Sequence, residues 1–346
     1  MKAARWYGLK DVRIEDVAVP ATPDNKIKVQ VKKCGICGSD LHAYYHGLGV
    51  SLEPHPITGK SFPVTLGHEF GGEIVEIGSA VNTTLKVGDR ITVEPNIYRL
   101  DDPMVAKGKY NLSRDAGFLG YQDDGGFAEY VLVDKHMVHK LPDGVSYEEA
   151  ALVEPTAVAF QAVRNSTLKV GDQVAVFGVG PIGQLTVMCA RMAGATTIVA
   201  VDVSAERLEM AKKCGATHVI NGKDADVVAQ IMAITGGVDV AYECAGVQAT
   251  FDNALNSLVS GGELMIVAGY AEPVQFNTIL ALLTEKKIST SIGYRNVYPQ
   301  VLAAIALKLI DPKKVVTKEI ALKDLVKEGF EALHGQPKHS KILVKS

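Results

Sequence analysis

The sequence predicts an α/β protein with two domains, a β-rich region followed by a doubly wound parallel sheet. At 346 residues, the chain is too long for one simple hydrophobic core. Up to about residue 150, it contains short segments in which apolar and polar residues alternate, the pattern of half-buried strands. From about Ser146 onward, apolar strands alternate with helical segments, which is typical of a parallel sheet covered by helices.

The strands of the first part are separated by turns at the spacing of a barrel-like fold. We expect them at residues 2–7, 12–19, 27–33, 73–77, 90–94 and 127–133. A helical run at 147–163, interrupted by Pro155, leads into the second part. There we expect strands at 173–177, 197–201, 218–220, 238–242, 263–268 and 287–292, with helices at 205–213, 226–234 and 249–258. Later helices at 300–309 and 325–333 and a strand at 341–344 can return to the first domain.

Charge and composition favour small-molecule partners and a cytoplasmic location. A net charge of −3, without a cluster of lysine or arginine, argues against binding to nucleic acid or to an anionic membrane. The most apolar region is interrupted by Gln184, Arg191 and Asp202, so no segment is expected to span a membrane. The five cysteines form an odd and sparse set, which favours a reducing compartment over a disulfide scaffold.

A glycine-rich motif follows the first strand of the second part and opens a helix. Its glycines allow a tight turn and close approach of the backbone to a pyrophosphate, and the helix N-terminus adds unpaired N–H groups. The next strand ends in Asp202, about 20 residues further on, as expected of an acid that binds an adenosine ribose. Asp202 favours NAD over NADP because it would repel a 2′-phosphate, although the nearby Arg207 can serve a phosphate. The motif therefore predicts a Rossmann domain whose cofactor contacts are Gly178, Gly180, Pro181, Ile182, Gly183, Asp202 and Arg207.

A second motif lies near the N-terminus and reads Cys34-Gly35-Ile36-Cys37-Gly38-Ser39-Asp40-Leu41-His42. It places a thiol, a hydroxyl and an imidazole on a glycine turn that runs into a helix. Cys37, Ser39 and His42 can line one wall of a cleft for metal-assisted chemistry on a small alcohol or carbonyl. The Cys-x-x-Cys spacing also suits a redox pair, half of a zinc site or a plain turn.

Cys37, His68 and Glu154 form a candidate zinc site, because each is expected at the end of an element. Zinc binds cysteine sulfur, histidine nitrogen and carboxylate oxygen, and a catalytic site keeps one position open. Taken singly, His68 also suits a hydrogen-bonded core residue, and Glu154 or Glu69 suits a solvated carboxylate.

In combination, four ordered motifs resemble the zinc-dependent medium-chain dehydrogenases along nearly the whole chain. The resemblance implies a GroES-like β-rich catalytic domain at residues 1–155 and 295–346 and a Rossmann NAD-binding domain at residues 156–294. It also implies an enzyme that transfers hydride between NAD(H) and a secondary alcohol or ketone. The motifs are Cys37 to His42, Gly67-His68-Glu69, Val153-Glu154-Pro155 and Gly178 to Gly183.

The resemblance can be narrowed to a branch of the family. Glu154, where the simple alcohol dehydrogenases carry a cysteine, looks like the polyol and diol branch. Residues 1–7, 55–60 and 243–248 are similar to 2,3-butanediol dehydrogenases, which implies butanediol and acetoin as the substrate pair. Sorbitol or another polyol is the alternative. A zinc-free quinone reductase usually lacks the pair Cys37 and His68, and a non-catalytic NAD-binding protein would have no use for a proton relay.

The resemblance also assigns roles to individual residues. It makes Cys37, His68 and an acid the zinc ligands, with either Glu69 or Glu154 on the metal and the other reached through water. Ser39 and His42 match the positions of the proton relay. Arg295 looks like the polyol-branch arginine that contacts a substrate hydroxyl.

The sequence departs from the family pattern at four positions where many relatives carry the cysteines of a structural zinc. These positions are Arg99, Asp102, Val105 and Ser113. We therefore expect one catalytic zinc per chain, with Arg99 and Asp102 able to pair in place of the lost cross-link. Relatives are dimers or tetramers, so we expect a homodimer or homotetramer, with the sheet edge at residues 287–292 as one candidate contact.

Overall fold

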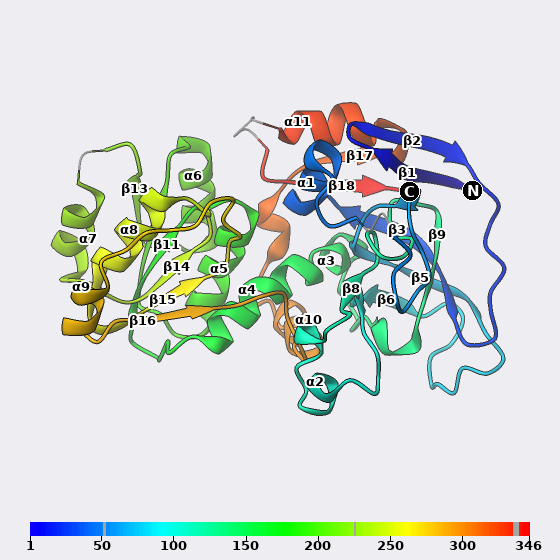
Figure 1. Ribbon diagram of the computed structural model, residues 1–346, viewed down its shortest axis with the longest axis horizontal. Coiled ribbons are helices and arrows are strands. Elements are labelled where there is room, and N and C mark those ends of the chain that lie inside the picture. Colours follow the sequence, from blue (N-terminus) through cyan, green and yellow to red (C-terminus); the bar gives the residue numbers. More distant parts are fainter. Residues whose placement is uncertain (51–52, 225, 335–338) are drawn as a thin grey trace. The chain divides into compact units, whose positions relative to one another are not determined.

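The protein, described by a computed structural model over residues 1–50, 53–224, 226–334 and 339–346, forms two compact units (Figure 1). Both the β-rich domain and the parallel-sheet domain of the predicted fold class are confirmed. The predicted boundary had assigned all residues after 294 to the first domain. Instead, the 3₁₀ helix Pro312–Val315 packs on helices of the second unit. The first unit comprises Met1–Glu154, Tyr298–Leu307 and Val316–Ser346, and the second Pro155–Val297 and Lys308–Val315.

Two larger β-sheets form most of the first unit. The smaller is antiparallel, in the order β2-β1-β4. The larger has the order β10-β6-β5-β3-β18-β17, with β9 also paired to β3. The C-terminal strand β18 thus lies directly beside β3, the strand that leads into the cysteine motif. The strands are β1 (Lys2–Gly8), β2 (Asp11–Asp16), β3 (Ile27–Gly35), β4 (Val64–Thr65), β5 (Glu69–Ile77), β6 (Arg90–Val93), β9 (Tyr130–Val133), β10 (Val138–Lys140), β17 (Val316–Ala321) and β18 (Lys341–Lys345).

Helices cover these sheets and close a core that includes Ile27, Phe70 and Phe127, all fully buried. The helical run expected at 147–163 is two helices, and the break lies at Leu152 rather than at Pro155. Pro155 occupies the first turn of the second helix, where its missing N–H costs no hydrogen bond. The helices are α1 (Gly38–His46), α3 (Tyr147–Ala151), α10 (Tyr298–Ala306) and α11 (Glu331–Leu333), the last preceded by a π-helical turn, Leu325–Phe330. Helix α4 (Val153–Asn165) begins at the end of the first unit and belongs mostly to the second.

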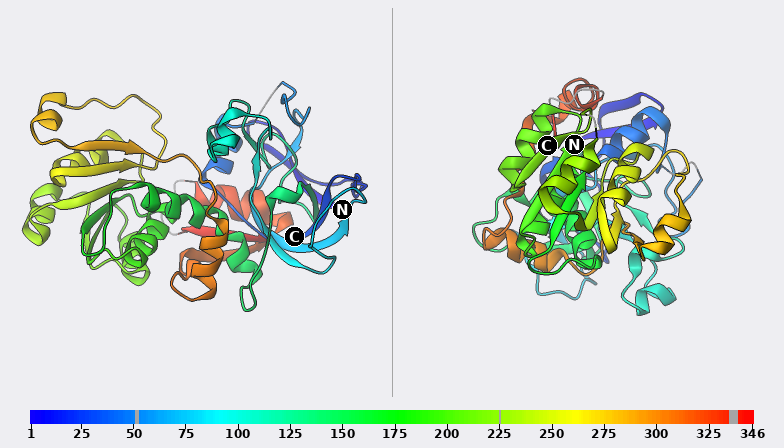
Figure 2. Two further views of the ribbon diagram at one scale, coloured as in Figure 1. Left: turned by 90° about the horizontal axis from the view of Figure 1, so that it is seen from below. Right: turned by 90° about the vertical axis from the view of Figure 1, so that its left-hand side faces the viewer.

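In the part of the second unit that the structure describes, the strands pair in parallel in the order β13-β12-β11-β14-β15-β16. Helices α5 and α6 pack together, as do α7 and α8, on the two faces of this sheet (Figure 2). The strand order reverses between β11 and β14. The elements are β11 (Gln173–Phe177), α5 (Pro181–Met192), β12 (Thr197–Asp202), α6 (Ala205–Cys214), β13 (His218–Asn221), α7 (Val227–Thr235), β14 (Val238–Glu243), α8 (Gln248–Ser257), β15 (Leu258–Ile266), α9 (Thr278–Leu283) and β16 (Lys287–Thr290). Among the described residues, no helix is long and apolar enough to cross a membrane.

The segment that contains the four positions Arg99, Asp102, Val105 and Ser113 forms a small lobe with β7 (Asn96–Ile97), α2 (Pro103–Ala106) and β8 (Gly117–Phe118). The expected pairing of Arg99 with Asp102 is wrong. Asp102 is the N-cap of α2, and its carboxylate accepts a hydrogen bond from the backbone N–H of Met104 at 2.7 Å. Arg99 instead places Nε 3.4 Å from the exposed carboxylate of Asp101.

A buried carboxylate ties this lobe to the sheet. Glu94 directly follows β6, and its Oε1 accepts hydrogen bonds from the hydroxyl of Tyr110 and from Asn96 Nδ2. Its Oε2 lies 3.0 Å from Nε2 of His139 on β10. The ring of Tyr110 stacks on Tyr98 with centroids 4.8 Å apart. Polar contacts and ring packing therefore hold the lobe.

The Tyr110 hydroxyl should contribute measurably to the stability of the first unit. Tyr110→Phe removes a hydrogen bond to a buried charged group, so we expect the free energy of unfolding to fall by about 1.5–3 kcal/mol. Urea denaturation followed by the fluorescence of Trp6, the single tryptophan, would measure the change. Tyr98→Phe is the matched control, because it keeps the ring stack and should leave stability close to wild type. Equal stability of both variants would contradict a role for the Glu94 contact.

Candidate active site

The cysteine motif forms a turn that places Cys37 immediately before α1. Cys37 has an extended backbone and is the N-cap residue of the helix. Its N–H donates to Oδ2 of Asp40 at 2.9 Å, which fixes the turn. The other oxygen of Asp40, Oδ1, lies 3.6 Å from Nδ1 of His68. The fully buried Asp40 therefore holds the backbone at Cys37 and faces the ring of His68.

His68 and Glu69 lie where β5 begins, next to the end of β3. Gly35 pairs with Glu69 across the two strands. A Cβ at Gly35 would lie 2.1 Å from Oε2 of Glu69, so only glycine leaves room for this carboxylate. The rings of Phe118 and Tyr121 flank His68, with centroids 6.2 and 5.3 Å from that of His68.

The structure brings together three of the predicted metal ligands. Potential ligand atoms of Cys37, His68 and Glu69 all lie within 4.8 Å of one another. His68 and Glu69 are buried, and Cys37 is partly exposed. The fourth candidate, Glu154, is also buried, at 5% exposure, at the start of α4.

Negative charge dominates this cluster. Burial alone would lower the pKa of His68, but the charges and hydrogen bonds of Asp40, Cys37 and Glu154 outweigh it and raise the pKa to about 10. The acids that draw a proton to His68 in this way would equally attract a metal cation. Zinc requires the neutral imidazole and the thiolate, so metal and proton compete for the same site.

Lys341 supplies a compensating positive charge inside the protein. Its Nζ lies 2.7 Å from both carboxylate oxygens of Glu69, and both side chains are essentially inaccessible to solvent. It also donates to the carbonyl of Ile36 at 2.9 Å. Burial works against the charged form, but the contact with Glu69 prevails and the pKa of Lys341 is raised. The lysine thus holds the Glu69 side chain in place.

The two predicted relay residues lie on α1. The hydroxyl of Ser39 is 3.4 Å from Nε2 of His68, at the edge of the ligand cluster. His42 follows one turn later and is exposed to solvent. Arg295 belongs to the second unit, where its backbone N–H donates to Oε1 of Gln161 at 3.4 Å. Its contact with a substrate hydroxyl stays a prediction.

In the second unit, the glycine-rich motif forms the predicted turn between β11 and α5. Gly178 has a φ of +82°, which favours glycine. Gly180, the N-cap of α5, has an ordinary extended backbone, and a Cβ there would meet no atom within 4 Å. Neither backbone conformation nor packing within the protein therefore requires glycine at position 180. Its glycine fits the close approach of a ligand to the helix N-terminus, as a pyrophosphate requires.

Asp202 ends β12 and faces this turn. One carboxylate oxygen accepts from the N–H of Val179 at 2.8 Å and the other from the N–H of Ser204 at 3.0 Å. A carboxylate has about four acceptor positions, so capacity remains for ribose hydroxyls. Nη1 of Arg207 lies 3.9 Å from Asp202. The arginine that can serve a phosphate thus lies beside the acid predicted to bind the adenosine ribose.

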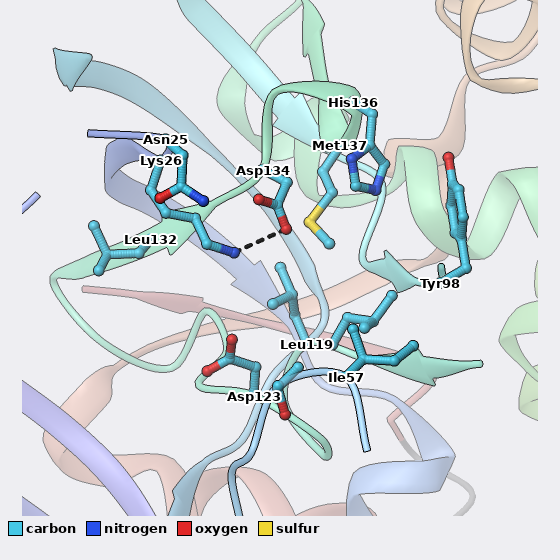
Figure 3. Close-up of a pocket in the computed structure, with 12 residues that line it drawn as sticks. Asn25, Lys26, Ile57, Tyr98, Leu119, Asp123, Leu132, Asp134, His136 and Met137 are labelled. Carbon is cyan, nitrogen blue, oxygen red and sulfur yellow. Dashed lines mark hydrogen bonds and ion pairs between the residues drawn. The ribbon is translucent and has the colours of Figure 1, made fainter. Parts of the chain in front are cut away.

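A cavity of about 320 Å³ lies elsewhere in the first unit (Figure 3). The ion pair between Lys26 and Asp134, 2.8 Å long, crosses it. None of the predicted ligand or relay residues lines this cavity, which is bounded by Asn25, Lys26, Ile57, Thr58, Ile97, Tyr98, Leu119, Asp123, Leu132, Asp134, His136 and Met137.

Two residues of the site were not predicted. Asp40 stands inside the cysteine motif, and its spacing from Cys37 is that of a helix-capping residue, a signal that was available. Lys341 is 272 residues from Glu69, and the only signal in the sequence is a lysine at the start of an apolar strand.

Comparisons with known proteins agree with this geometry. The family model of the alcohol dehydrogenase GroES-like domain matches residues 23–143, and that of zinc-binding dehydrogenases matches residues 181–307. The chain is 47% identical to the (R,R)-butanediol dehydrogenase of Bacillus subtilis, covering 100% of this chain and 99% of the relative. It is 37% identical to the sorbitol dehydrogenase of the same organism, over 99% and 97% of the two chains. The crystal structure of 2R,3R-butanediol dehydrogenase from Bacillus subtilis superposes with a TM-score of 0.95 at 46% identity, covering 100% and 99% of the two chains.

Breaking the ion pair of Lys341 should destabilise the metal-free protein. Lys341→Met leaves Glu69 as an uncompensated buried charge, so we expect the free energy of unfolding to fall by about 3–5 kcal/mol. Urea denaturation of zinc-depleted protein, followed by Trp6 fluorescence, would measure this loss.

The double variant Lys341→Met/Glu69→Gln is the control. It removes both charges, so no uncompensated charge stays buried, and we expect most of the stability to return. A single variant as stable as wild type would show that the pair contributes nothing.

Proposed function

The chain belongs to the zinc-dependent medium-chain dehydrogenases, and we propose that it interconverts 2,3-butanediol and acetoin with NAD(H). The observation that carries this proposal is the ligand cluster of Cys37, His68 and Glu69. It occurs in a chain that is 47% identical, over its full length, to a butanediol dehydrogenase. Sorbitol or another polyol is the alternative substrate, supported by 37% identity to a sorbitol dehydrogenase.

The cluster fits a catalytic zinc by its donor atoms, which are a thiolate sulfur, an imidazole nitrogen and a carboxylate oxygen. We assign Cys37, His68 and Glu69 as ligands, with Glu154 as the acid that can take the place of Glu69. The ion pair with Lys341 supports such an exchange, because it gives Glu69 a partner when the carboxylate leaves the metal. We further propose a single zinc per chain, since the lobe at residues 96–118 contains no cysteine.

The roles of the side chains follow from their places. A bound zinc would supply a Lewis acid that polarises the oxygen of the alcohol or ketone, and NAD would supply the hydride acceptor. Asp40 orients the ring of His68, as carboxylates do for metal-binding histidines. The hydroxyl of Ser39 lies beside the cluster and would take the proton of the substrate hydroxyl, which His42 would pass to water. Arg295 is proposed to bind the second hydroxyl of a diol.

The decisive experiment measures zinc content and substrate preference together. We expect about one zinc per chain, as three protein ligands with one open position require, and NADH formation with 2,3-butanediol well above that with sorbitol. Cys37→Ser should lose both zinc and activity, because a serine hydroxyl does not replace a thiolate ligand. Cys34→Ala is the matched control in the same motif and should keep its zinc.

Each other outcome would contradict a separate part of the proposal. Two zincs per chain would place a second metal in the lobe. Turnover without metal would move the chain to the zinc-free reductases, and a preference for sorbitol would move it to the polyol dehydrogenases. Faster reduction of NADP than of NAD would contradict the role given to Asp202.

We also propose that the chain forms a homo-oligomer through β16. This strand ends the sheet of the second unit and leaves one edge open. The adjacent α9 contains two leucines, Leu282 and Leu283, that are 75% and 78% exposed, and Ile292 beyond the strand is 69% exposed. An open strand edge beside apolar side chains suits pairing with a second copy about a two-fold axis.

The free thiols of all five cysteines support a reducing, cytoplasmic location.

Charging this apolar surface should disrupt the oligomer. Leu282→Lys/Leu283→Glu would bury charges in the interface, so we expect a smaller particle by sedimentation velocity. Val170→Lys is the control, because Val170 is 85% exposed in the same unit but lies in the loop before β11. An unchanged particle in the double variant, or a monomeric wild type, would refute the interface.

A further inference from the structure

Glu243 is a fully buried carboxylate at the carboxyl ends of the strands in the parallel sheet. It is the last residue of β14, and it pairs with Phe177, the last residue of β11. The strand order reverses between these two strands, and ligands of open α/β sheets bind in the crevice outside the carboxyl ends at such a reversal. A buried charge at this position needs an explanation, because burial of an unpaired carboxylate is costly.

The loop that follows β14 is hydrogen-bonded to this carboxylate. Oε1 of Glu243 accepts from the N–H groups of Ala245 and Gly246, at 2.9 and 3.0 Å, and from the hydroxyl of Thr250 at 2.7 Å. Oε2 accepts from the same Gly246 N–H at 3.1 Å. Two consecutive loop amides and one side chain of α8 therefore converge on one acid, which fixes the loop as a rigid bend.

This loop in turn packs against the glycine-rich turn. A Cβ at Gly178 would lie 2.7 to 2.9 Å from three atoms of Ala245, its Cβ, N and Cα. The N–H of Cys244 also donates to the carbonyl of Phe177 at 2.8 Å, directly before that turn. The position of Ala245 thus limits where the Gly178 turn can lie. The glycine-rich turn and the loop that Glu243 holds are therefore direct neighbours.

We propose that Glu243 is a positioning residue for the dinucleotide, which it serves by holding the loop at Ala245 and Gly246 against the glycine-rich turn. The proposal rests on the proposed function, since it concerns the NAD site of that enzyme. Glu243 itself need not touch the cofactor. Its loss would let the loop and the turn relax and would weaken dinucleotide binding, while the ligand cluster of the first unit keeps its metal.

The test is the dissociation constant of NADH, measured by its fluorescence on the zinc-loaded enzyme. In Glu243→Gln, a neutral amide replaces an acceptor-only carboxylate, and we expect the constant to rise about threefold to tenfold, the scale of one weakened charged hydrogen bond. Glu243→Ala removes the acceptors for both loop amides and should weaken binding further. In both variants KM for NAD should rise more than KM for the alcohol, with zinc content unchanged.

Glu263 provides a matched control in the same sheet. It is 2% exposed on the neighbouring strand β15, and its carboxylate accepts from the N–H and the hydroxyl of Thr167, at 2.5 and 2.9 Å, in the segment before β11. Glu263→Gln should lower the melting temperature but leave NADH binding as in wild type. Equal NADH binding by wild type and both Glu243 variants would overturn the proposal, as would equal weakening by Glu263→Gln. A wild-type enzyme that binds no NADH would instead refute the proposed function.

Discussion

The buried ion pair between Lys341 and Glu69 is the interaction on which the architecture of the first unit depends. Two charges removed from water are tolerated only when geometry and further hydrogen bonds compensate their desolvation. Here Nζ of Lys341 reaches both oxygens of Glu69 and the carbonyl of Ile36. These contacts require β18 to lie beside β3, so the C-terminal strand must return to the sheet that carries the cysteine motif.

The same ion pair offsets part of the negative charge at the candidate metal site. Asp40, Cys37 and Glu154 raise the pKa of His68 to about 10, and the carboxylate of Glu69 lies in the same cluster. Lys341 balances one of these charges permanently. The remainder favours a cation at the open side of the cluster, the role of a catalytic metal. The site therefore contains one permanent positive charge, that of Lys341, and keeps enough negative charge to attract a metal cation.

In the proposed function, the second unit has a different task, which is to bind an anionic dinucleotide next to buried carboxylates. Asp202 and Glu243 stand at the carboxyl ends of β12 and β14, and each is satisfied by backbone N–H groups. The glycine-rich turn between them offers its own N–H groups at the start of α5. Because backbone N–H groups pair with both acids, neither leaves an unpaired charge next to the glycine-rich turn.

The sequence by itself determined the order of the elements, the two-part architecture and the family. Alternation of period two and glycine turns act over a few residues, so strands such as β11 and the turn at Gly178 to Gly183 were predicted at their observed places. Cys37 and His68 were predicted as ligands because they stand in short local motifs, and the structure brings their side chains together. The local pattern predicted the helix break at Pro155, but it lies at Leu152. Proline does not mark the break because it is also favoured in the first turn of a helix.

Only the tertiary structure decided which distant side chains meet. The contacts of Lys341 with Glu69, of Asp40 with His68 and of Gly178 with Ala245 depend on strand register and on the packing of one loop against another. The same holds for Asp102, whose carboxylate caps a helix instead of pairing with Arg99. Register and packing are properties of the whole sheet, because each pairing constrains the next. No window of the sequence contains that information.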